Sequence, residues 1–272
     1  MIRLIATDLD GTLLDERGEL PEGNRLSLIR AREAGCKIVI CSGRMLDSVT
    51  RFAQAIGVNA PTIVFNGAAA IDTRTGACVF SNAIPPEIAR RACAIARQHG
   101  EFIQAFPAKG FFYEKRVPKV CDIYEGRIQA RGQETGIPLS EWIDQPILKL
   151  LSLGEPDKLR LLEAEIVRAC PQLRLMYSRP TYLEMVFEGV DKGNALREIC
   201  RIEGISPQEV LAFGDQENDL EMLEFAGLGY AMENATDEVK RRTQYRAPRF
   251  DRLGVASVVN DYLARGEIGG QP

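Results

Sequence analysis

Two aspartates stand close together where a short apolar run ends near the start of the chain. In the segment IATDLDGTLLD, residues 5–15, Asp8 and Asp10 are separated by one leucine and followed by Gly11. Clustered carboxylates repel one another unless a hard cation such as Mg²⁺ neutralises them. The spacing therefore indicates a site at which carboxylates meet a metal ion.

Residues of similar chemistry follow two other apolar runs. Ser42 and Gly43 come after KIVIC, and Asp215 comes after VLAFG, while Lys192 begins a predicted helix. Ligands of open parallel sheets bind beyond the carboxyl ends of the strands, so we expect these residues to share one site. Three carboxylates, a hydroxyl and a lysine suit a divalent metal ion together with a phosphoryl group.

The chemistry expected of the aspartate pair is phosphoryl transfer. A metal ion between an aspartate and a phosphate oxygen offsets the repulsion that keeps a carboxylate from attacking phosphorus. Asp8 is the predicted nucleophile, forming an aspartyl-phosphate, and Asp10 is the predicted acid/base for the leaving alkoxide and then for water. Gly11 allows a sharp turn that can bring Asp10 toward the same cleft.

The other residues are predicted to bind the phosphate and to complete the metal site. Ser42, with the backbone N–H groups of the next two residues at the mouth of a helix, forms a phosphate cradle. Lys192 stabilises the transition state as a point charge. Asp215 completes the metal site, and Asp219, one helical turn further on, is placed to orient Lys192 or a metal-bound water.

The elements that must position these residues alternate in type. Three β-branched runs and the two helical patterns between them predict strands and helices in turn, at 3–9, 22–35, 36–42, 45–57 and 61–67. In the first helix, Leu26 and Ile29 form the predicted apolar stripe. Strands that are apolar on both faces are typical of a parallel sheet covered by helices. We expect an α/β fold with a Rossmann-like core.

A different pattern begins after about Ser81. A helix opened by prolines is followed by closely spaced strands, a turn-rich stretch, a further helix and the strands LRLMYS and YLEMVF. This order predicts an inserted antiparallel α+β domain at 84–188. The alternation of strand and helix patterns then returns, so the core is expected to comprise 1–83 and 189–272.

Composition narrows the class of partner. The chain has 272 residues, 45% hydrophobic and 26% charged, and a net charge of -4. This net negative charge provides no excess of basic residues that would attract nucleic acid or an anionic membrane. The start MIRLIATDL lacks the pattern of a signal peptide, and no apolar stretch approaches the ~20 residues of a membrane helix. We expect a cytoplasmic protein without nucleic-acid or membrane partners.

Cysteine and histidine are predicted to be structural. The seven cysteines are scattered and form no C-x-x-C pair, which argues against a disulfide framework or a zinc cluster and favours small buried hydrophobic residues. The single histidine, His99, precedes a glycine and is predicted to lie at a helix end. Chemistry must then depend on carboxylates, lysine, hydroxyls and the backbone.

The motifs resemble those of a known superfamily. DLDGTLL, CSGR, DKGNAL and FGDQENDLEML look like the four ordered motifs of the haloacid dehalogenase superfamily, and the insertion resembles the C2-type cap of its Cof-like, class IIB phosphatases. The likeness extends through VFNGAAAID, YLEMVFEGVDKG and GYAMENATDEVK. One departure is Gln216, which stands where a smaller residue is commoner.

The resemblance implies roles for individual residues. Asp8 matches the nucleophile, Asp10 the acid/base whose backbone carbonyl binds Mg²⁺, and Asp215 the remaining metal ligand. The family's phosphate contacts match Ser42, Gly43 and Lys192, and a position near substrate or metal waters matches Asn218. The expected enzyme is a Mg²⁺-dependent phosphatase of small phosphorylated metabolites, with sugar phosphates favoured, whose cap closes over the substrate and whose assembly is a monomer or small homo-oligomer.

Other interpretations remain open at this level. Each site residue has a structural alternative, such as a helix cap, a turn or a solvated surface charge. A phosphomutase of the same superfamily would return the phosphoryl group to its product. A receiver-like phosphate acceptor and a non-catalytic sugar-phosphate binder are less favoured, because neither needs the complete set of residues together with a substrate lid.

Overall fold

The computed structural model describes residues 1–128 and 130–269. The chain divides into two compact units, which we describe separately. The core unit comprises Met1–Phe80 together with the segment from Asp191 onward, and the inserted unit comprises Ser81–Val190. The insertion predicted at 84–188 lies within the second unit.

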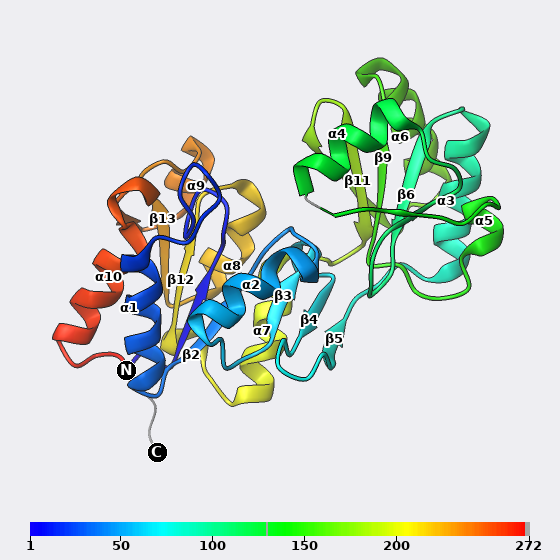
Figure 1. Cartoon of the computed structure of the whole chain (residues 1–272). Coiled ribbons are helices and arrows are strands. Elements are labelled where there is room, and N and C mark those ends of the chain that lie inside the picture. Colours follow the sequence, from blue (N-terminus) through cyan, green and yellow to red (C-terminus); the bar gives the residue numbers. More distant parts are fainter. Residues whose placement is uncertain (129, 270–272) are drawn as a thin grey trace. The chain divides into compact units, whose positions relative to one another are not determined.

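A parallel sheet of five strands forms the centre of the core unit (Figure 1). Its order is β14-β13-β12-β1-β2, and every neighbouring pair runs parallel. The strands are β1 (Leu4–Thr7), β2 (Lys37–Ile40), β12 (Val210–Gly214), β13 (Leu228–Met232) and β14 (Tyr245–Ala247). Since Thr7 is in register with Phe213, β1 and β12 end side by side. The predicted α/β fold is confirmed.

Helices cover this sheet because its strands are apolar on both faces. The cluster on one face joins alternate strand residues such as Leu4 and Val210 to Leu196 and Ile199 of α7, while α1 and α10 pack against each other (Figure 1). The helices are α1 (Glu22–Glu33), α2 (Leu46–Ile56), α7 (Lys192–Glu203), α8 (Leu220–Phe225), α9 (Asp237–Arg242) and α10 (Gly254–Ala264). Short 3₁₀ turns are η1 (Phe65–Gly67), η2 (Pro207–Glu209), η3 (Glu217–Asp219) and η4 (Phe250–Arg252).

The stripe predicted for α1 is wrong at Leu26, while Ile29 is half-buried. Leu26 is 42% exposed, whereas Leu28 is fully buried. The buried face also includes Asn24, whose side chain donates to the Leu13 carbonyl and accepts from the Ala256 N–H. A buried polar residue at this position rotates the helix away from the orientation that its apolar residues alone suggest.

The third predicted strand belongs to a different sheet. β3 (Thr62–Val64) pairs antiparallel with β4 (Ala69–Ile71), and β5 (Cys78–Ser81) completes this three-stranded sheet. A single parallel bridge, between Cys41 and Ile63, continues the order of the large sheet beyond β2. The run 61–67 thus meets β2 through one bridge, while all three residues of β3 pair with β4.

The inserted unit is a six-stranded sheet with helices, ordered β10-β11-β9-β6-β7-β8. Its pairs are antiparallel except β7 with β8. Its strands are β6 (Phe102–Phe106), β7 (Phe112–Tyr113), β8 (Gln133–Glu134), β9 (Lys149–Leu153), β10 (Leu173–Arg179) and β11 (Tyr182–Phe187). Its helices are α3 (Pro86–Gln98), α4 (Pro118–Ile128), α5 (Leu139–Trp142) and α6 (Pro156–Ala169). The predicted α+β character of the insertion is confirmed.

The two faces of this sheet differ in polarity. One face packs apolar residues such as Ile103 and Leu150 against α3 and α6, and Leu162 is one of the α6 residues in this cluster. By strand alternation the other face carries Gln104, Lys149 and Glu184, all less than 9% exposed. Lys149 Nζ lies 3.3 Å from Glu184 Oε2. Charged and polar side chains are thus built into the interior of the inserted unit.

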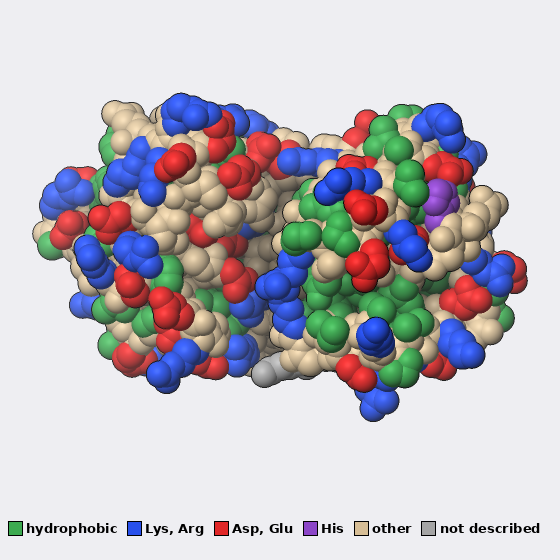
Figure 2. Space-filling model, turned by 90° about the horizontal axis from the view of Figure 1, so that it is seen from above, with side chains coloured by type: hydrophobic (Ala, Val, Ile, Leu, Met, Phe, Trp, Pro, Cys, Tyr) green, Lys and Arg blue, Asp and Glu red, His purple; other side chains and the backbone are tan. Residues whose placement is uncertain are grey.

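Cysteine and histidine follow the sequence-based expectations except at Cys78, which was predicted to be buried. Six cysteines are buried and Cys78 is exposed. His99 is the C-cap residue of α3, and its Nε2 lies 2.5 Å from Glu165 Oε2. Among the described residues, no helix combines the length and hydrophobicity needed to cross a membrane. On the face shown in Figure 2, basic and acidic side chains are interspersed.

Candidate active site

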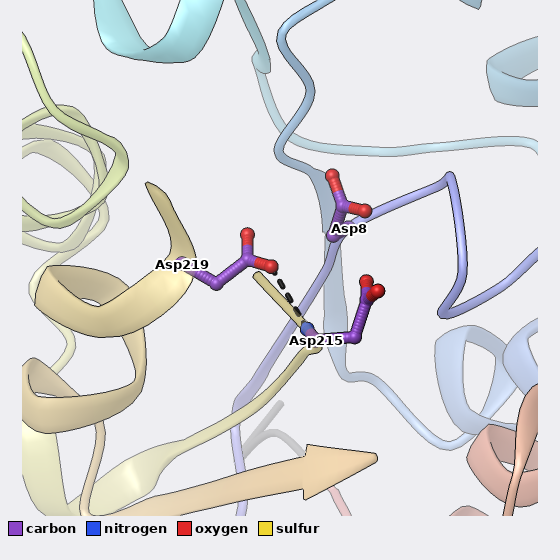
Figure 3. Close-up of side chains that lie close together, drawn as sticks. All are labelled: Asp8, Asp215 and Asp219. Carbon is purple, nitrogen blue, oxygen red and sulfur yellow. Dashed lines mark hydrogen bonds between the residues drawn. The ribbon is translucent and has the colours of Figure 1, made fainter. Parts of the chain in front are cut away.

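Three buried carboxylates meet where neighbouring strands of the core sheet end. Asp8 follows β1, Asp215 follows β12, and Asp219 is the last residue of η3. One oxygen of each lies within 4.8 Å of the others, and the residues are 6%, 3% and 0% exposed. Figure 3 shows the Asp8 and Asp215 carboxylates next to each other, with Asp219 approaching from the helical side.

A buried lysine joins two of these carboxylates. Lys192, the first residue of α7, is 1% exposed, and its Nζ donates to Asp8 Oδ1 and Asp219 Oδ1, both at 2.6 Å. Asp191 fixes the start of this helix by accepting a hydrogen bond from the Asn194 N–H. Lys192 is therefore held in place by its backbone and by both carboxylates.

Asp219 is bound by protein donors at both oxygens. Its Oδ2 accepts from the N–H groups of Asp215 and Gln216 at 2.9 and 3.1 Å, while Oδ1 accepts from Lys192. A Cβ on Gly214 would lie 2.4 Å from Asp219 Cβ, so only glycine permits this approach. The geometry fits a residue that orients Lys192 better than a direct metal ligand.

Asp215 is positioned by two neutral donors. Thr12 Oγ1 donates to its Oδ1 and Gln216 Nε2 to its Oδ2, both at 2.9 Å. Gly11 has a φ of +79°, and a Cβ there would lie 2.4 Å from Asp215 Oδ2. The sequence reasoning assigned no role to Thr12 or Gln216. Their polar side chains next to site aspartates were the available signal.

Burial changes the acidity of the cluster. Desolvation, together with the charges of Asp219 and Asp215, raises the pKa of Asp8 to about 8, although Lys192 opposes the shift. Desolvation raises the pKa of Asp215 to about 6. The pKa of Lys192 is also raised, because the charges of Asp219 and Asp8 outweigh its desolvation. The raised pKa values of Asp8 and Asp215 mean that ionising both carboxylates is unfavourable in the metal-free site.

Asp10 lies outside the carboxylate cluster. Its side chain is 61% exposed and pairs with Arg44, whose Nε and Nη2 donate to Oδ2 and Oδ1 at 2.7 and 2.5 Å. Its hydrogen bonds to Asp10 raise the pKa of Arg44, although burial opposes the shift. The sequence reasoning gave the Arg44 side chain no role.

The predicted phosphate loop lies before α2. Ser42 is 1% exposed, and its Oγ accepts from the Arg44 N–H at 3.1 Å. Since α2 begins at Leu46, Gly43 and Arg44 lie in the turn before the helix and not in its first turn. The Arg44 N–H therefore stabilises this turn, and the predicted cradle is left with Gly43 as its backbone donor.

Asn218 reaches this loop through a second asparagine. Asn218 Nδ2 donates to Asn66 Oδ1 at 2.9 Å, and the Asn66 N–H donates to the Ser42 carbonyl at 3.0 Å. Asn66 adopts a left-handed conformation with φ of 57°. Asn218 is thereby connected to the loop that contains Ser42.

The donor set fits a divalent cation held by Asp8 and Asp215. Both carboxylates are buried beside each other with their charge only partly compensated, and oxygen ligands of this kind suit hard cations. Within residues 1–128 and 130–269, the donor to the Asp8 side chain is Lys192, at Oδ1, which leaves Oδ2 available. The Asp215 oxygens each accept one hydrogen bond and retain lone pairs for a metal ion.

The fold and the site together define an α/β protein with an acidic site at the ends of parallel strands. The chain belongs to the haloacid dehalogenase-like hydrolase family, whose family model matches residues 5–259. The resemblance read from the four motifs is confirmed. The chain is therefore an enzyme of this family. Its phosphatase relatives are consistent with an activity as a phosphoric monoester hydrolase.

Individual relatives match over nearly their whole length. The 5-amino-6-(5-phospho-D-ribitylamino)uracil phosphatase YcsE of Bacillus subtilis is 28% identical over 263 residues, 96% of each chain. A solved structure from Thermotoga maritima is 32% identical with a TM-score of 0.88, covering 96% of this chain and 97% of that one. A haloacid dehalogenase-like hydrolase from Bacteroides thetaiotaomicron is 29% identical with a TM-score of 0.88, covering 96% and 99%.

Proposed function

We propose that this protein is a Mg²⁺-dependent phosphatase that hydrolyses small phosphorylated metabolites through an aspartyl-phosphate on Asp8. The observation that carries the proposal is the buried chain of contacts from Asp8 to Lys192 to Asp219 at the end of β1. A nucleophilic carboxylate needs a fixed orientation and a nearby cation to approach a phosphate. Asp8 has both.

In the first step, a carboxylate oxygen of Asp8 attacks phosphorus and the bond between phosphorus and the leaving oxygen breaks. Lys192, held by Asp219, offsets negative charge on the transferring group. Asp10 gives its proton to the leaving alkoxide, and Ser42 and Gly43 bind the phosphate oxygens. A divalent cation on Asp8, Asp215 and the Asp10 carbonyl would supply Lewis-acid charge neutralisation when bound.

In the second step, water attacks the phosphorus of the aspartyl-phosphate. Asp10, now a carboxylate, takes the proton of that water, and the bond between phosphorus and Asp8 breaks. Inorganic phosphate leaves and both aspartates return to their starting states. The same residue thus serves first as acid and then as base.

The proposed substrates are phosphate monoesters of sugars or sugar-like polyols. The motif resemblance favours sugar phosphates, and the YcsE relative is named as the phosphatase of a compound with a phosphate on a ribityl chain. The inserted unit is proposed to act as a cap that closes over the substrate and excludes water.

The test is phosphate release across a panel of phosphorylated sugars, polyols, nucleotides and cofactors, with Mg²⁺ and with a chelator. We expect metal-dependent release that Asp8→Asn abolishes while the variant retains its fold. Isomer formation without phosphate release would identify a phosphomutase instead. Substantial activity in Asp8→Asn would refute the assigned nucleophile.

A further inference from the structure

The bidentate pair between Arg44 and Asp10 has an unusual setting. Asp10 lies three positions after Thr7, the last residue of β1, and its side chain is mainly exposed, at 61%. An exposed carboxylate on a turn would sample several rotamers, yet a general acid must meet the leaving oxygen in one orientation. Arg44 contacts both of its oxygens, which fixes the plane of the carboxylate as well as its position.

Arg44 is itself firmly anchored. Its N–H donates to Ser42 Oγ, and its carbonyl accepts from the Phe65 N–H at 3.1 Å. Its guanidinium carbon lies 5.6 Å from the centre of the Phe52 ring, and its side chain is 27% exposed. The guanidinium is thus attached to the same turn that carries Ser42 and Gly43.

We propose that Arg44 is a positioning residue that holds Asp10 for proton transfer and sets its place relative to the phosphate loop. The inference rests on the proposed function, since it assigns Arg44 a part in the acid/base step. A bidentate contact restricts both oxygens of a mainly exposed carboxylate at once, as a residue that transfers protons requires. The planar fork of arginine, which lysine lacks, is what the contact uses.

The role predicts a dependence on the leaving group. An alkyl phosphate needs a proton on its leaving oxygen, whereas the nitrophenolate of p-nitrophenyl phosphate departs without one. The value of kcat/KM reports the steps through departure of the leaving group. Loss of Asp10 positioning should therefore lower kcat/KM for the alkyl ester much more than for the aryl ester.

The experiment compares Arg44→Ala, Arg44→Lys and Arg51→Ala with the wild type on glucose 6-phosphate and p-nitrophenyl phosphate, in the presence of Mg²⁺. Arg51 is the matched control, because its guanidinium lies 4.4 Å from the same Phe52 ring but pairs with Glu19 instead of Asp10. If glucose 6-phosphate is not turned over, the preferred alkyl ester of the panel replaces it. Asp10→Asn provides the reference for complete loss of the acid/base.

We expect Arg44→Ala to lose about tenfold or more in kcat/KM for the alkyl ester and less than about threefold for the aryl ester, since general acid catalysis contributes about 10²–10⁴. Arg44→Lys should recover only part of the loss. A burst of nitrophenol should appear in Arg44→Ala, because Asp10 also activates water for the second step. Arg51→Ala should match the wild type on both esters.

Three results would overturn the inference. An equal rise in KM for both esters would make Arg44 a direct phosphate contact. Equal losses accompanied by a lower melting temperature would make it structural, and unchanged kinetics would leave it without a role in turnover. A wild-type protein that releases phosphate from no ester contradicts the proposed function itself, and the inference falls with it.

Discussion

Lys192 is the residue on which the charge balance of the core site depends. It is the buried cation between Asp8 and Asp219, so Lys192→Met leaves two carboxylates facing each other in a desolvated site. We expect the free energy of unfolding of the metal-free protein to fall by about 3 kcal/mol, the usual cost of removing one partner of a buried ion pair. Urea denaturation at neutral pH measures it.

A matched control separates burial from charge. Lys158→Met removes a lysine that is 67% exposed and lies 3.9 Å from Glu101, and should change stability by less than about 1 kcal/mol. Adding Asp8→Asn to Lys192→Met should recover part of the loss, because one of the opposed carboxylates is gone. Wild-type stability of Lys192→Met would contradict the charge balance described here.

The raised pKa values of Asp8 and Asp215 also predict how Mg²⁺ stabilises the protein. The pKa of Asp8 is about 8 in the folded state against a usual 3.8, and that of Asp215 is about 6. Between pH 3.8 and about pH 8 the folded state binds more protons than the unfolded state. The metal-free protein therefore loses stability as the pH rises through this range. A cation bound to the ionised carboxylates removes the penalty.

We therefore expect the increase in melting temperature caused by Mg²⁺ to be larger at about pH 8.5 than at about pH 5.5. Thermal unfolding at both pH values, with Mg²⁺ and with chelator, measures it. Asp8→Asn should flatten the dependence. An equal stabilisation at both pH values would show that Mg²⁺ does not bind these carboxylates.

At the scale of elements, β6 carries a polar residue with an unusual environment. Gln104 is fully buried, and neither its Oε1 nor its Nε2 has a hydrogen-bond partner among residues 1–128 and 130–269. Unsatisfied buried groups destabilise the folded state. Gln104→Leu should raise the free energy of unfolding by about 1 kcal/mol, whereas Gln133→Leu on exposed β8 should change it by less than about 0.5 kcal/mol. A less stable Gln104→Leu would indicate that the amide is satisfied by ordered water.

Element type could be predicted well because it depends on periodicity. Buried parallel strands appear as short runs of β-branched residues. After Ser81 the alternation of strand and helix patterns gives way to closely spaced strands, which indicated the insertion. The orientation of α1 could not be predicted, because the buried Asn24 is held by hydrogen bonds to the Leu13 carbonyl, 11 residues away, and to the Ala256 N–H, 232 residues away. The strand β14 was also missed, since three residues, YRA, provide almost no pattern.

At the scale of the whole molecule, the site depends on topology more than on any one motif. Asp8 and Lys192 are 184 positions apart, and Lys192 Nζ lies 2.6 Å from Asp8 Oδ1. Their proximity was predicted from the rule that ligands bind at the carboxyl ends of parallel strands. The contacts of Arg44 and Gln216 could not be predicted in the same way, because side-chain pairing within loops follows no period. The sequence therefore predicts which acids gather, and the structure adds what orients them.

The most direct test of the account is the location of the phosphoryl group during turnover. The protein is mixed with Mg²⁺ and a substrate labelled in its phosphoryl group, quenched rapidly in acid, digested and mapped by mass spectrometry. The account predicts a label on Asp8 in the wild type, a stronger label in Asp10→Asn if that variant is slowed most in the water step, and none in Asp8→Asn. Metal-dependent phosphate release with a label on another residue, or with an unaltered yield from Asp8→Asn, would contradict it.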